Sequence, residues 1–500
     1  MLFNSYDFVF AFLPATLLGY HILSKLAGRK VVVWWLVICS LVYYGWWKAE
    51  YLALILASIL LNFVLGRCIS RRGGGRTGKA LLTAGVAVNL SLLGYFKYFN
   101  FFVETANSLT GASLQVGRIT LPIAVSFFTF QQIAFLVDVW RGETREPGLG
   151  EYSLFVTFFP QLIAGPIVHH KETLPQFMRG GASGLRSRDM SIGVTIFVFG
   201  LFKKVAIADT MARLASPVFE AAELGVGATF AGAWVAALAY GMQIYFDFSG
   251  YSDMAIGLGR LFGIRLPLNF HSPYKAQSIA DFWRRWHMTL SRFLRDYLYI
   301  PLGGNRKGKP RRYLNVMVTM LLGGLWHGAG WTFVLWGALH GLYLCAGAAL
   351  SRALGGTEGG SRERSPARRA LACGATFLLV VLAWVLFRAE TLSGALLIYK
   401  GMFGCGGPGI GLSRALAAKG AWLAIPMAAC WLLPNTQELM SRFKPALDYD
   451  AKYGFSLRSG RRHAWVLWKP DWRWALLTGA LGMAAVALFA RASEFIYYQF

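Results

Sequence analysis

The sequence predicts an all-α polytopic membrane protein, and three observations support this fold class. Of its 500 residues, 56% are apolar and only 15% are charged, whereas soluble domains carry about 25% charged residues. Apolar runs of membrane-spanning length recur from Asp7 to Phe500. No polar stretch between them is long enough for a soluble domain, so residues 1–500 are expected to form a single integral membrane domain.

The membrane segments follow from the need for about 20 mostly apolar residues per span. Several runs are interrupted by Gly and Pro, as at Leu162–Pro166 and Leu321–Gly324, and these are predicted to be re-entrant or half-helices buried inside protein. No small-residue cleavage site follows the first run, so no removable signal peptide is expected. The thirteen candidate runs are residues 7–26, 31–47, 51–66, 80–96, 119–138, 151–168, 190–210, 228–248, 313–327, 331–350, 370–388, 419–433 and 473–490.

Basic residues set the expected orientation. The formal net charge is +26, and the Lys and Arg residues cluster between apolar runs, as in cytoplasmic loops. This favours a lipid bilayer, and no nucleic acid, as the partner surface. The clusters at 25–30, 67–79 and 306–312 are expected in the cytoplasm, which places the N-terminus outside. The basic, glycine-containing stretch 351–369 is predicted to be a flexible loop, followed by C-terminal membrane helices in 370–500.

The segment Ser278–Ile300 differs from these runs. Ser278 and Asp281 resemble a helix capping box. Apolar residues then recur at helical spacing, and the opposite arc carries four arginines, Arg284, Arg285, Arg292 and Arg295. The pattern predicts one amphipathic helix that lies at the bilayer surface or covers a membrane cavity.

Two of the eight histidines are candidates for chemistry. His327 lies in an apolar run with four glycines and two tryptophans, and an ionisable group inside a membrane segment is a functional candidate. Burial keeps an imidazole neutral, as a general base must be. His287 lies at the border of the apolar arc of Ser278–Ile300, where it could meet His327. The alternatives are a hydrogen-bonded core histidine for His327 and an ordinary interfacial histidine for His287, while His340 is expected to pack.

Charged residues form a second group of candidates. Asp247 and Asp253 at a membrane-helix boundary are costly unless they are paired, and structural pairing with Arg260 or Arg284 is favoured over direct chemistry. Arg284 and Arg285, with the 306–312 cluster, could attract the phosphates of a donor molecule. The alternative for these arginines is a solvated helix face near anionic lipid.

Several catalytic signatures do not occur in the sequence. It has no His-x-x-x-x-Asp, no Gly-x-Ser-x-Gly, no Walker loop and no His-Glu-x-x-His. Serine hydrolysis, ATP-driven transport and zinc proteolysis therefore lose support. The six cysteines include no Cys-x-x-Cys pair, so no metal site and no bound cofactor are predicted.

The motifs together resemble the membrane-bound O-acyltransferase (MBOAT) family, in its bacterial branch of polysaccharide O-acetyltransferases that includes the membrane subunit of alginate acetylation. The resemblance covers nearly the whole chain, and residues 90–345 are richest in signatures. The matching segments are Leu93–Phe102, Phe158–Pro166, Tyr245–Ala255, Phe282–His287, Arg295–Gly304, Leu325–Gly328 and Glu494–Phe500. One departure is His271, where relatives often carry Asn.

The resemblance implies a fold and a set of site residues. The family fold is a ring of about 11–13 transmembrane or re-entrant helices around a central funnel or tunnel, with interfacial amphipathic helices. His327 matches the catalytic histidine of the Trp-His-Gly motif, and His287 matches its partner. The positions expected to bind substrate are Trp326, Trp283, Arg284, Arg285, Asp253 and Tyr245.

The resemblance also implies a reaction in the bacterial inner membrane. An acetyl group would pass from a cytoplasmic thioester, expected to be acetyl-CoA, across the membrane for O-acetylation of an exported polysaccharide, through an extracytoplasmic partner of the SGNH acetyltransferase type. His327 would act as the base, and His287 would orient the donor or stabilise the oxyanion. The alternatives are D-alanyl transfer to teichoic acid, acetyl transfer to peptidoglycan, or a non-catalytic channel or transporter.

Overall fold

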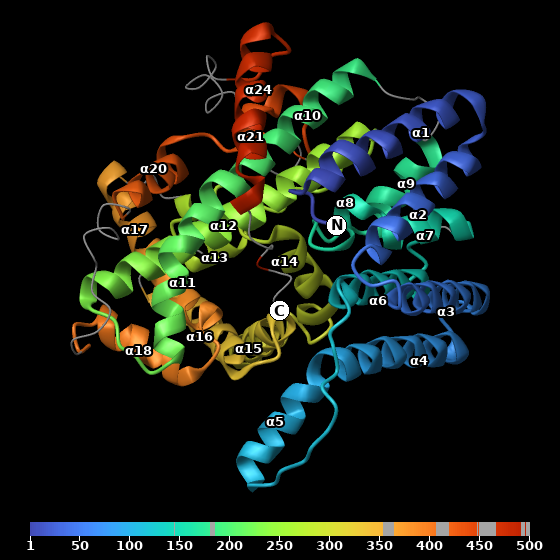
Figure 1. The fold of residues 1–500 in the computed structure, drawn as a ribbon. Coiled ribbons are helices and arrows are strands. Elements are labelled where there is room, and N and C mark those ends of the chain that lie inside the picture. Colours follow the sequence, from blue (N-terminus) through green and yellow to red (C-terminus); the bar gives the residue numbers. More distant parts are fainter. Residues whose placement is uncertain are drawn as a thin grey trace. The chain divides into compact units, whose positions relative to one another are not determined.

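The computed structural model describes residues 1–144, 146–180, 186–353, 365–406, 420–447, 449, 467–491 and 496. Within these residues the regular elements are helices, and the one extended pairing is an isolated bridge between Pro267 and Leu447. Figure 1 shows the helices in chain order. The predicted all-α class is confirmed.

The chain divides into two compact units. Unit 1 contains Met1–Leu201, Tyr251–Leu268 and Met440–Phe489. Its α-helices are α1 (Leu13–Leu26), α2 (Arg29–Gly45), α3 (Tyr51–Arg72), α4 (Arg76–Leu93), α5 (Phe99–Thr110), α6 (Val125–Trp140), α7 (Leu149–Thr157), α8 (Phe159–Leu162), α9 (His170–Gly180), α10 (Ser187–Phe202) and α24 (Trp472–Ala487).

Unit 2 contains Phe202–Gly250, Asn269–Leu439 and Ala490–Phe500. The long helix α12 (Phe230–Leu261) begins in unit 2 and ends in unit 1. The other α-helices of unit 2 are α11 (Asp209–Glu223), α13 (Ile279–Trp283), α14 (Met288–Leu294), α15 (Gly308–His327), α16 (Trp331–Ala353), α17 (Pro366–Arg388), α18 (Leu392–Met402), α20 (Ala424–Leu432) and α21 (Thr436–Leu439).

Six helical segments of the described part are long and apolar enough to cross a membrane. They are Asp7–Leu26, Tyr51–Arg72, Arg76–Thr110, Ser187–Glu223, Trp331–Ala353 and Pro366–Arg388. Each exceeds the roughly 17 residues that a span requires, so the chain is a multi-pass membrane protein. Of the other predicted runs, 228–248 lies mostly in the 32-residue helix α12 and 313–327 in the 20-residue helix α15, and the rest form shorter or interrupted helices.

The run 151–168 is an example of an interrupted segment. Here α7 ends and α8 begins at Phe158, whose backbone leaves the helical region (φ −48°, ψ 107°). Pro160 lies in the first turn of α8, where proline is tolerated because its missing N–H would have no helical partner. A Cβ on Gly165 would lie 2.5 Å from the Cα of Gln161, so the chain beyond α8 folds back closely. The predicted break at Leu162–Pro166 is confirmed. The one predicted at Leu321–Gly324 is wrong, because α15 continues through these residues.

The prediction of one helix over Ser278–Ile300 is wrong. The structure has α13 over Ile279–Trp283, a bend, and then α14 from Met288. The predicted cap is present, because the Ser278 hydroxyl accepts the Asp281 N–H at 3.1 Å. Helical spacing persists across the bend, so the pattern could not reveal it. The bend forms because the chain there bonds to an earlier segment.

The predicted loop 351–369 is partly helical. α16 continues to Ala353, and α17 begins at Pro366, where Ser365 accepts the N–H of Arg368 at 3.4 Å. Residues 354–364 lie outside the described residues. The C-terminal motif Glu494–Phe500 also lies outside them, except for Ile496.

Candidate functional site

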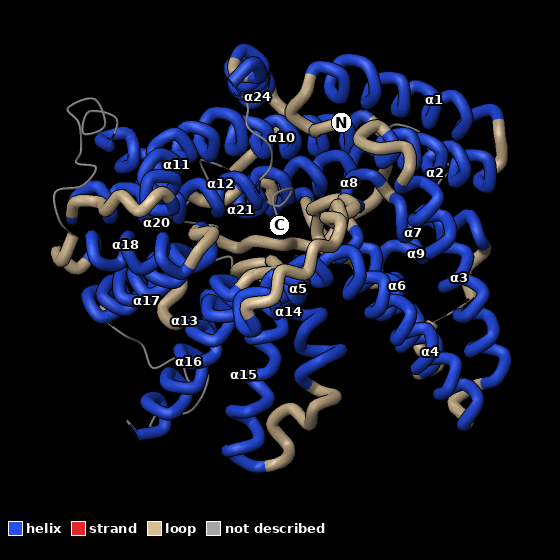
Figure 2. The backbone as a smooth tube through the Cα atoms, turned by 60° about the horizontal axis from the view of Figure 1, so that its bottom comes forward, coloured by secondary structure: helices blue, strands red, loops and turns tan. Residues whose placement is uncertain are grey.

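Close packing of α15 against α16 positions His327. The two helices lie side by side in both views (Figures 1 and 2), and glycines make this possible. A Cβ on Gly324 would lie 2.3 Å from the carbonyl oxygen of Phe333, and one on Gly337 would lie 2.3 Å from that of Met320. Only glycine permits backbones to approach so closely. The end of α15 is thereby held against α16.

His327 is enclosed by aromatic rings and is only 3% exposed. Its ring centroid lies 5.0 Å from that of Trp326, 5.1 Å from that of Trp336 on α16 and 5.3 Å from that of Phe387 on α17. Residues from three helices therefore fix the imidazole. An apolar enclosure of this kind also strengthens electrostatic interactions at the ring, because it excludes water.

His287 lies at the bend between α13 and α14. Its backbone is left-handed (φ 40°, ψ 52°), which costs a non-glycine residue about 1–3 kcal/mol unless the surroundings impose it. Two hydrogen bonds impose it here. The N–H of Met288 donates to the carbonyl of Asn269 at 3.0 Å, and the N–H of His271 donates to the carbonyl of Arg285 at 2.9 Å. The bend is thus tied to the segment that follows α12.

Asn269 determines which nitrogen of His287 carries the proton. Its Oδ1 accepts the Thr289 hydroxyl at 2.9 Å and the Thr289 N–H at 3.4 Å, which identifies this atom as the amide oxygen. The Nδ1 of His287 lies 3.1 Å from the same oxygen. Because an amide oxygen only accepts, Nδ1 must be the donor. The neutral ring then carries its lone pair on Nε2.

Burial lowers the pKa of His287 to about 3. The side chain is fully buried, and desolvation disfavours the charged imidazolium. The ring of Phe248 meets it edge-on at 4.7 Å and 87°. His287 is therefore neutral at pH 7, the state in which an imidazole nitrogen can accept a proton.

The two histidines meet, as the sequence predicted. Their ring centroids are 6.1 Å apart, and Trp326 lies at the same distance from His287. Two imidazoles at this separation can contact one small reacting group from two sides. The arrangement suits proton transfer in a water-poor site.

Comparison with known proteins places this site in a family. Residues 141–367, which include both histidines, match the model of the membrane-bound O-acyltransferase family. The chain is 44% identical over 433 residues to a peptidoglycan O-acetyltransferase of Helicobacter pylori, covering 81% of this chain and 80% of that protein. The chain belongs to the membrane-bound O-acyltransferase family.

Two further relatives differ in their named substrates. The acyltransferase is 44% identical over 412 residues to a Pseudomonas aeruginosa protein named "Probable alginate O-acetylase AlgI", covering 81% of this chain and 75% of that protein. It is 28% identical over 235 residues to a teichoic acid D-alanyltransferase of Streptococcus thermophilus, covering 44% of this chain and 55% of that protein. The similarity to the acetyltransferases is thus greater and longer.

Trp283 of the acyltransferase lies one ring further from His327 than Trp326 does, and Tyr245 is linked to His287 through the rings of Phe270 and Phe248. Trp283 contacts Trp336 at 5.7 Å, and Trp336 contacts His327. Trp283 also donates its indole N–H to Nδ1 of His340 at 3.3 Å, and the packing role expected for His340 stays a prediction. Tyr245 lies 6.4 Å from Trp286 in a neighbouring aromatic cluster. The substrate-binding role assigned to both residues stays a prediction.

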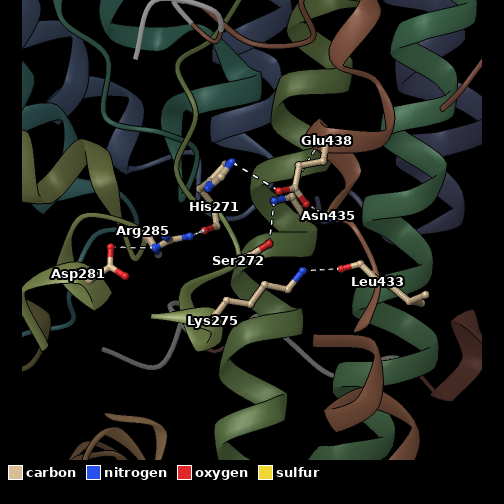
Figure 3. Close-up of polar contacts among 8 residues, drawn as sticks. All are labelled: His271, Ser272, Lys275, Asp281, Arg285, Leu433, Asn435 and Glu438. Carbon is tan, nitrogen blue, oxygen red and sulfur yellow. Dashed lines mark hydrogen bonds and ion pairs between the residues drawn. The ribbon is translucent and has the colours of Figure 1, made fainter. Parts of the chain in front are cut away.

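Arg284 and Arg285 have different surroundings. Arg284 is exposed, and its Nε donates to the Ala280 carbonyl at 3.3 Å. Arg285 pairs with Asp281 at 3.0 Å and reaches the carbonyl of His271 at 3.5 Å (Figure 3). Arg284 is therefore the better placed of the two for an external anion.

Figure 3 shows how the segment after α12 is anchored within unit 2. His271 lies 3.8 Å from a carboxylate oxygen of Glu438, and burial lowers the pKa of this histidine. Ser272 accepts an amide N–H of Asn435 at 2.9 Å, and Lys275 donates to the carbonyl of Leu433 at 2.8 Å. These contacts fix the segment that carries Asn269.

The predicted partner of Asp247 is wrong. Asp247, fully buried in α12, pairs with Lys204, because Lys204 reaches it from the segment that joins α10 to α11. Arg260 pairs with Asp189 of α10 at 2.9 Å. Asp253 belongs to unit 1 and is 5% exposed, and its substrate-binding role stays a prediction. Structural pairing of Asp247 is confirmed.

Sequence reasoning missed four residues of this site, namely Asn269, Phe248, Trp336 and Phe387. Phe248 lies inside the recognised motif Tyr245–Ala255 and Asn269 lies two residues before His271, but no spacing rule links either to His287. Trp336 and Phe387 lie on apolar helices, where any aromatic residue is an ordinary core residue. The part of the chain that the structure describes contains no cluster of three metal-ligating side chains.

Proposed function

We propose that this acyltransferase moves an acetyl group from cytoplasmic acetyl-CoA through the bacterial inner membrane to a hydroxyl of an exported polysaccharide. An extracytoplasmic partner of the SGNH type would complete the transfer. The family and the acetyltransferase relatives support the acyl group. The single observation that carries the mechanism is the buried pair of His287 and His327, 6.1 Å apart.

In this mechanism His327 acts as the general base. It takes the proton of the acceptor hydroxyl while the hydroxyl oxygen attacks the thioester carbonyl, and the C–S bond breaks when the tetrahedral intermediate collapses. The proton passes to the departing thiolate, so the products are the O-acetyl ester and free CoA. General-base catalysis contributes about 10²–10⁴ in rate. Aromatic enclosure of His327 protects the thioester from water.

The tautomer of His287 restricts its role. With Nδ1–H directed at Asn269, neutral His287 offers a lone pair at Nε2 and no second N–H. It can accept a hydrogen bond from an amide N–H of the bound acyl donor, but it cannot donate one to an oxyanion. Of the two roles expected from the sequence, orientation is therefore favoured over oxyanion stabilisation.

The acetyl-CoA donor would be held by charged side chains as well as by the tunnel that the family fold implies. Acetyl-CoA carries phosphates, and a guanidinium binds phosphate through paired N–H groups. Arg284 is exposed and makes no ion pair in the described residues, so it suits this contact. Arg285 is engaged by Asp281. Replacing Arg284 should therefore raise the KM for acetyl-CoA more than replacing Arg285.

The test is a transfer assay with purified protein in proteoliposomes. Radiolabelled acetyl-CoA is supplied on one side, and CoA release and acetylated acceptor are measured for wild type and His327→Ala. Acetylation that depends on His327 supports the proposal. Transport of label without CoA release in either protein would identify a channel and overturn it.

Peptidoglycan is a second candidate acceptor, because the Helicobacter pylori relative is as similar, at 44% identity, as the alginate one. D-alanyl transfer is supported less, since that match covers 44% of the chain. Offering alginate-type polymer and peptidoglycan in parallel assays separates the two acetyl acceptors. Label in only one of them identifies the acceptor.

A further inference from the structure

Unit 1 contains an apolar cleft of about 1080 Å³ between α10 and α24, which lie side by side in both views (Figures 1 and 2). Its walls are mainly small and apolar residues. They include Val194 and Val198 of α10, Gly479, Gly482 and Met483 of α24, and Phe10. The cleft is separate from the histidine site, which belongs to unit 2.

Glycine keeps this cleft open. A Cβ on Gly479 would meet no atom within 4 Å, and one on Gly482 would lie 3.6 Å from Val198. Val194, opposite on α10, is 42% exposed. A larger side chain at Gly479 would therefore occupy the cleft without striking the protein, so packing does not explain the glycine.

One end of the cleft is aromatic and basic. Trp468, Lys469 and Trp472 line it, and Arg473 lies over the Trp472 ring at 5.5 Å. Asp471 also lines the cleft, and its carboxylate accepts the backbone N–H groups of Arg473 and Trp474 at 3.1 Å. The negative charge of Asp471 thus faces the backbone N–H groups at the start of α24. Lys469 and Arg473 together leave a net positive charge at this end.

We infer that this cleft binds an anionic phospholipid, with one acyl chain along α24 and the phosphate beside Lys469 and Arg473. Tryptophan and basic side chains at one end of an apolar surface match the boundary between headgroup and acyl chain. Trp472 to Val486 spans about 21 Å at 1.5 Å per residue. One leaflet of a hydrocarbon core of about 30 Å is shorter, so the cleft accommodates a whole chain.

The experiment is native mass spectrometry of the full-length protein. Detergent-purified protein is equilibrated with phosphatidylglycerol and phosphatidylcholine that carry identical acyl chains, and the retained lipid is identified. Gly479→Leu fills the cleft from α24, and Val194→Trp fills it from α10 if the first variant fails to fold. Gly374→Leu on α17, where a Cβ also meets no atom within 4 Å, is the matched control.

Wild type and Gly374→Leu should retain phosphatidylglycerol, and the two cleft variants should lose it by about tenfold or more, a difference of about 1.4 kcal/mol in binding. Lys469→Gln should lower the preference for phosphatidylglycerol about fivefold, the contribution of one basic residue near an anionic headgroup. Equal retention by Gly479→Leu and Gly374→Leu would overturn the site. Equal retention of both lipids by wild type would overturn the headgroup contact. A dimer lost only in the cleft variants would assign the cleft to a second copy of the chain and also overturn it.

Discussion

Replacing Asn269 by alanine tests the orientation of His287 directly. The substitution removes Oδ1, which accepts the Nδ1 hydrogen of His287 at 3.1 Å and the Thr289 hydroxyl at 2.9 Å. Each buried donor left without an acceptor costs about 1–3 kcal/mol. Asn269→Ala should therefore lower the free energy of unfolding by about 2–6 kcal/mol. Without this acceptor the Nδ1–H tautomer of His287 is no longer imposed, so the proton can occupy Nε2 and remove its lone pair.

Loss of the tautomer should reduce activity beyond the loss of folded protein. Partners that orient a histidine ligand in metal sites contribute about 10–100-fold in affinity or activity, and we expect a decrease of this size in acetyl transfer per folded molecule. Folded protein is measured by thermal unfolding in detergent, and transfer by release of CoA in proteoliposomes.

Thr289→Val is the matched control for this experiment. It removes one donor to Asn269 but leaves the His287 contact, so stability should fall by about 1 kcal/mol while activity changes little. Asn269→Asp supplies a second measurement, because a carboxylate beside Nδ1 would raise the pKa of His287 above about 3. Activity in that variant should decline at a higher pH as the medium is acidified. If Asn269→Ala were as active per folded molecule as Thr289→Val, the tautomer argument would be refuted.

Three further predictions concern the same unit. His327→Ala should insert normally into the membrane, but its acetyl-transfer rate should fall by a factor of about 10²–10⁴. His340→Gln, in the same aromatic cluster, should keep most of the wild-type rate. Equal rates in the two variants would show that His327 is not the general base. Gly324→Ala should lower the free energy of unfolding by about 1–3 kcal/mol through overpacking and should lower activity, because its Cβ would lie 2.3 Å from a carbonyl oxygen. Gly347→Ala should change neither, because a Cβ at that position would meet no atom within 4 Å. The free energy of unfolding of wild type should decrease as pH falls from about 6.5 toward 3, because His287 binds a proton at a higher pH in the unfolded state than in the folded state. If His287→Gln showed the same pH dependence as wild type, this prediction would be contradicted.

The sequence located the two candidate histidines better than the residues that support them. His327 stood out because ionisable side chains are rare in apolar segments, and His287 because it lies at the border of an apolar arc. Neither signal needs knowledge of tertiary contacts. Their contact across 40 positions was a hypothesis that the 6.1 Å separation confirms. Asn269 could not be found in this way, because an asparagine beside a membrane segment has many ordinary explanations.

The predictions of ion-pair partners and of one continuous helix over Ser278–Ile300 were wrong for a related reason. Arg260 was matched with acids near it in the sequence, whereas the structure pairs it with Asp189 on α10. Partners of buried charges depend on which helices pack together, and a single sequence does not specify this. The bend at His287 was hidden because side chains on both sides keep the helical period, while the hydrogen bonds that form the bend come from main-chain groups of Asn269 and His271.

The bend explains why two similar histidines can have different roles. In a continuous helix the N–H of Met288 would bond to a carbonyl four residues earlier, and nothing would bring Asn269 to the ring of His287. In the observed bend the same N–H bonds to the Asn269 carbonyl, and the Asn269 side chain fixes Nδ1 of His287. His327, at the end of a regular helix, is instead enclosed by the rings of Trp326, Trp336 and Phe387. The left-handed backbone of His287 is a local cost of about 1–3 kcal/mol, and it gives His287 a defined tautomer beside the imidazole that we propose as the base.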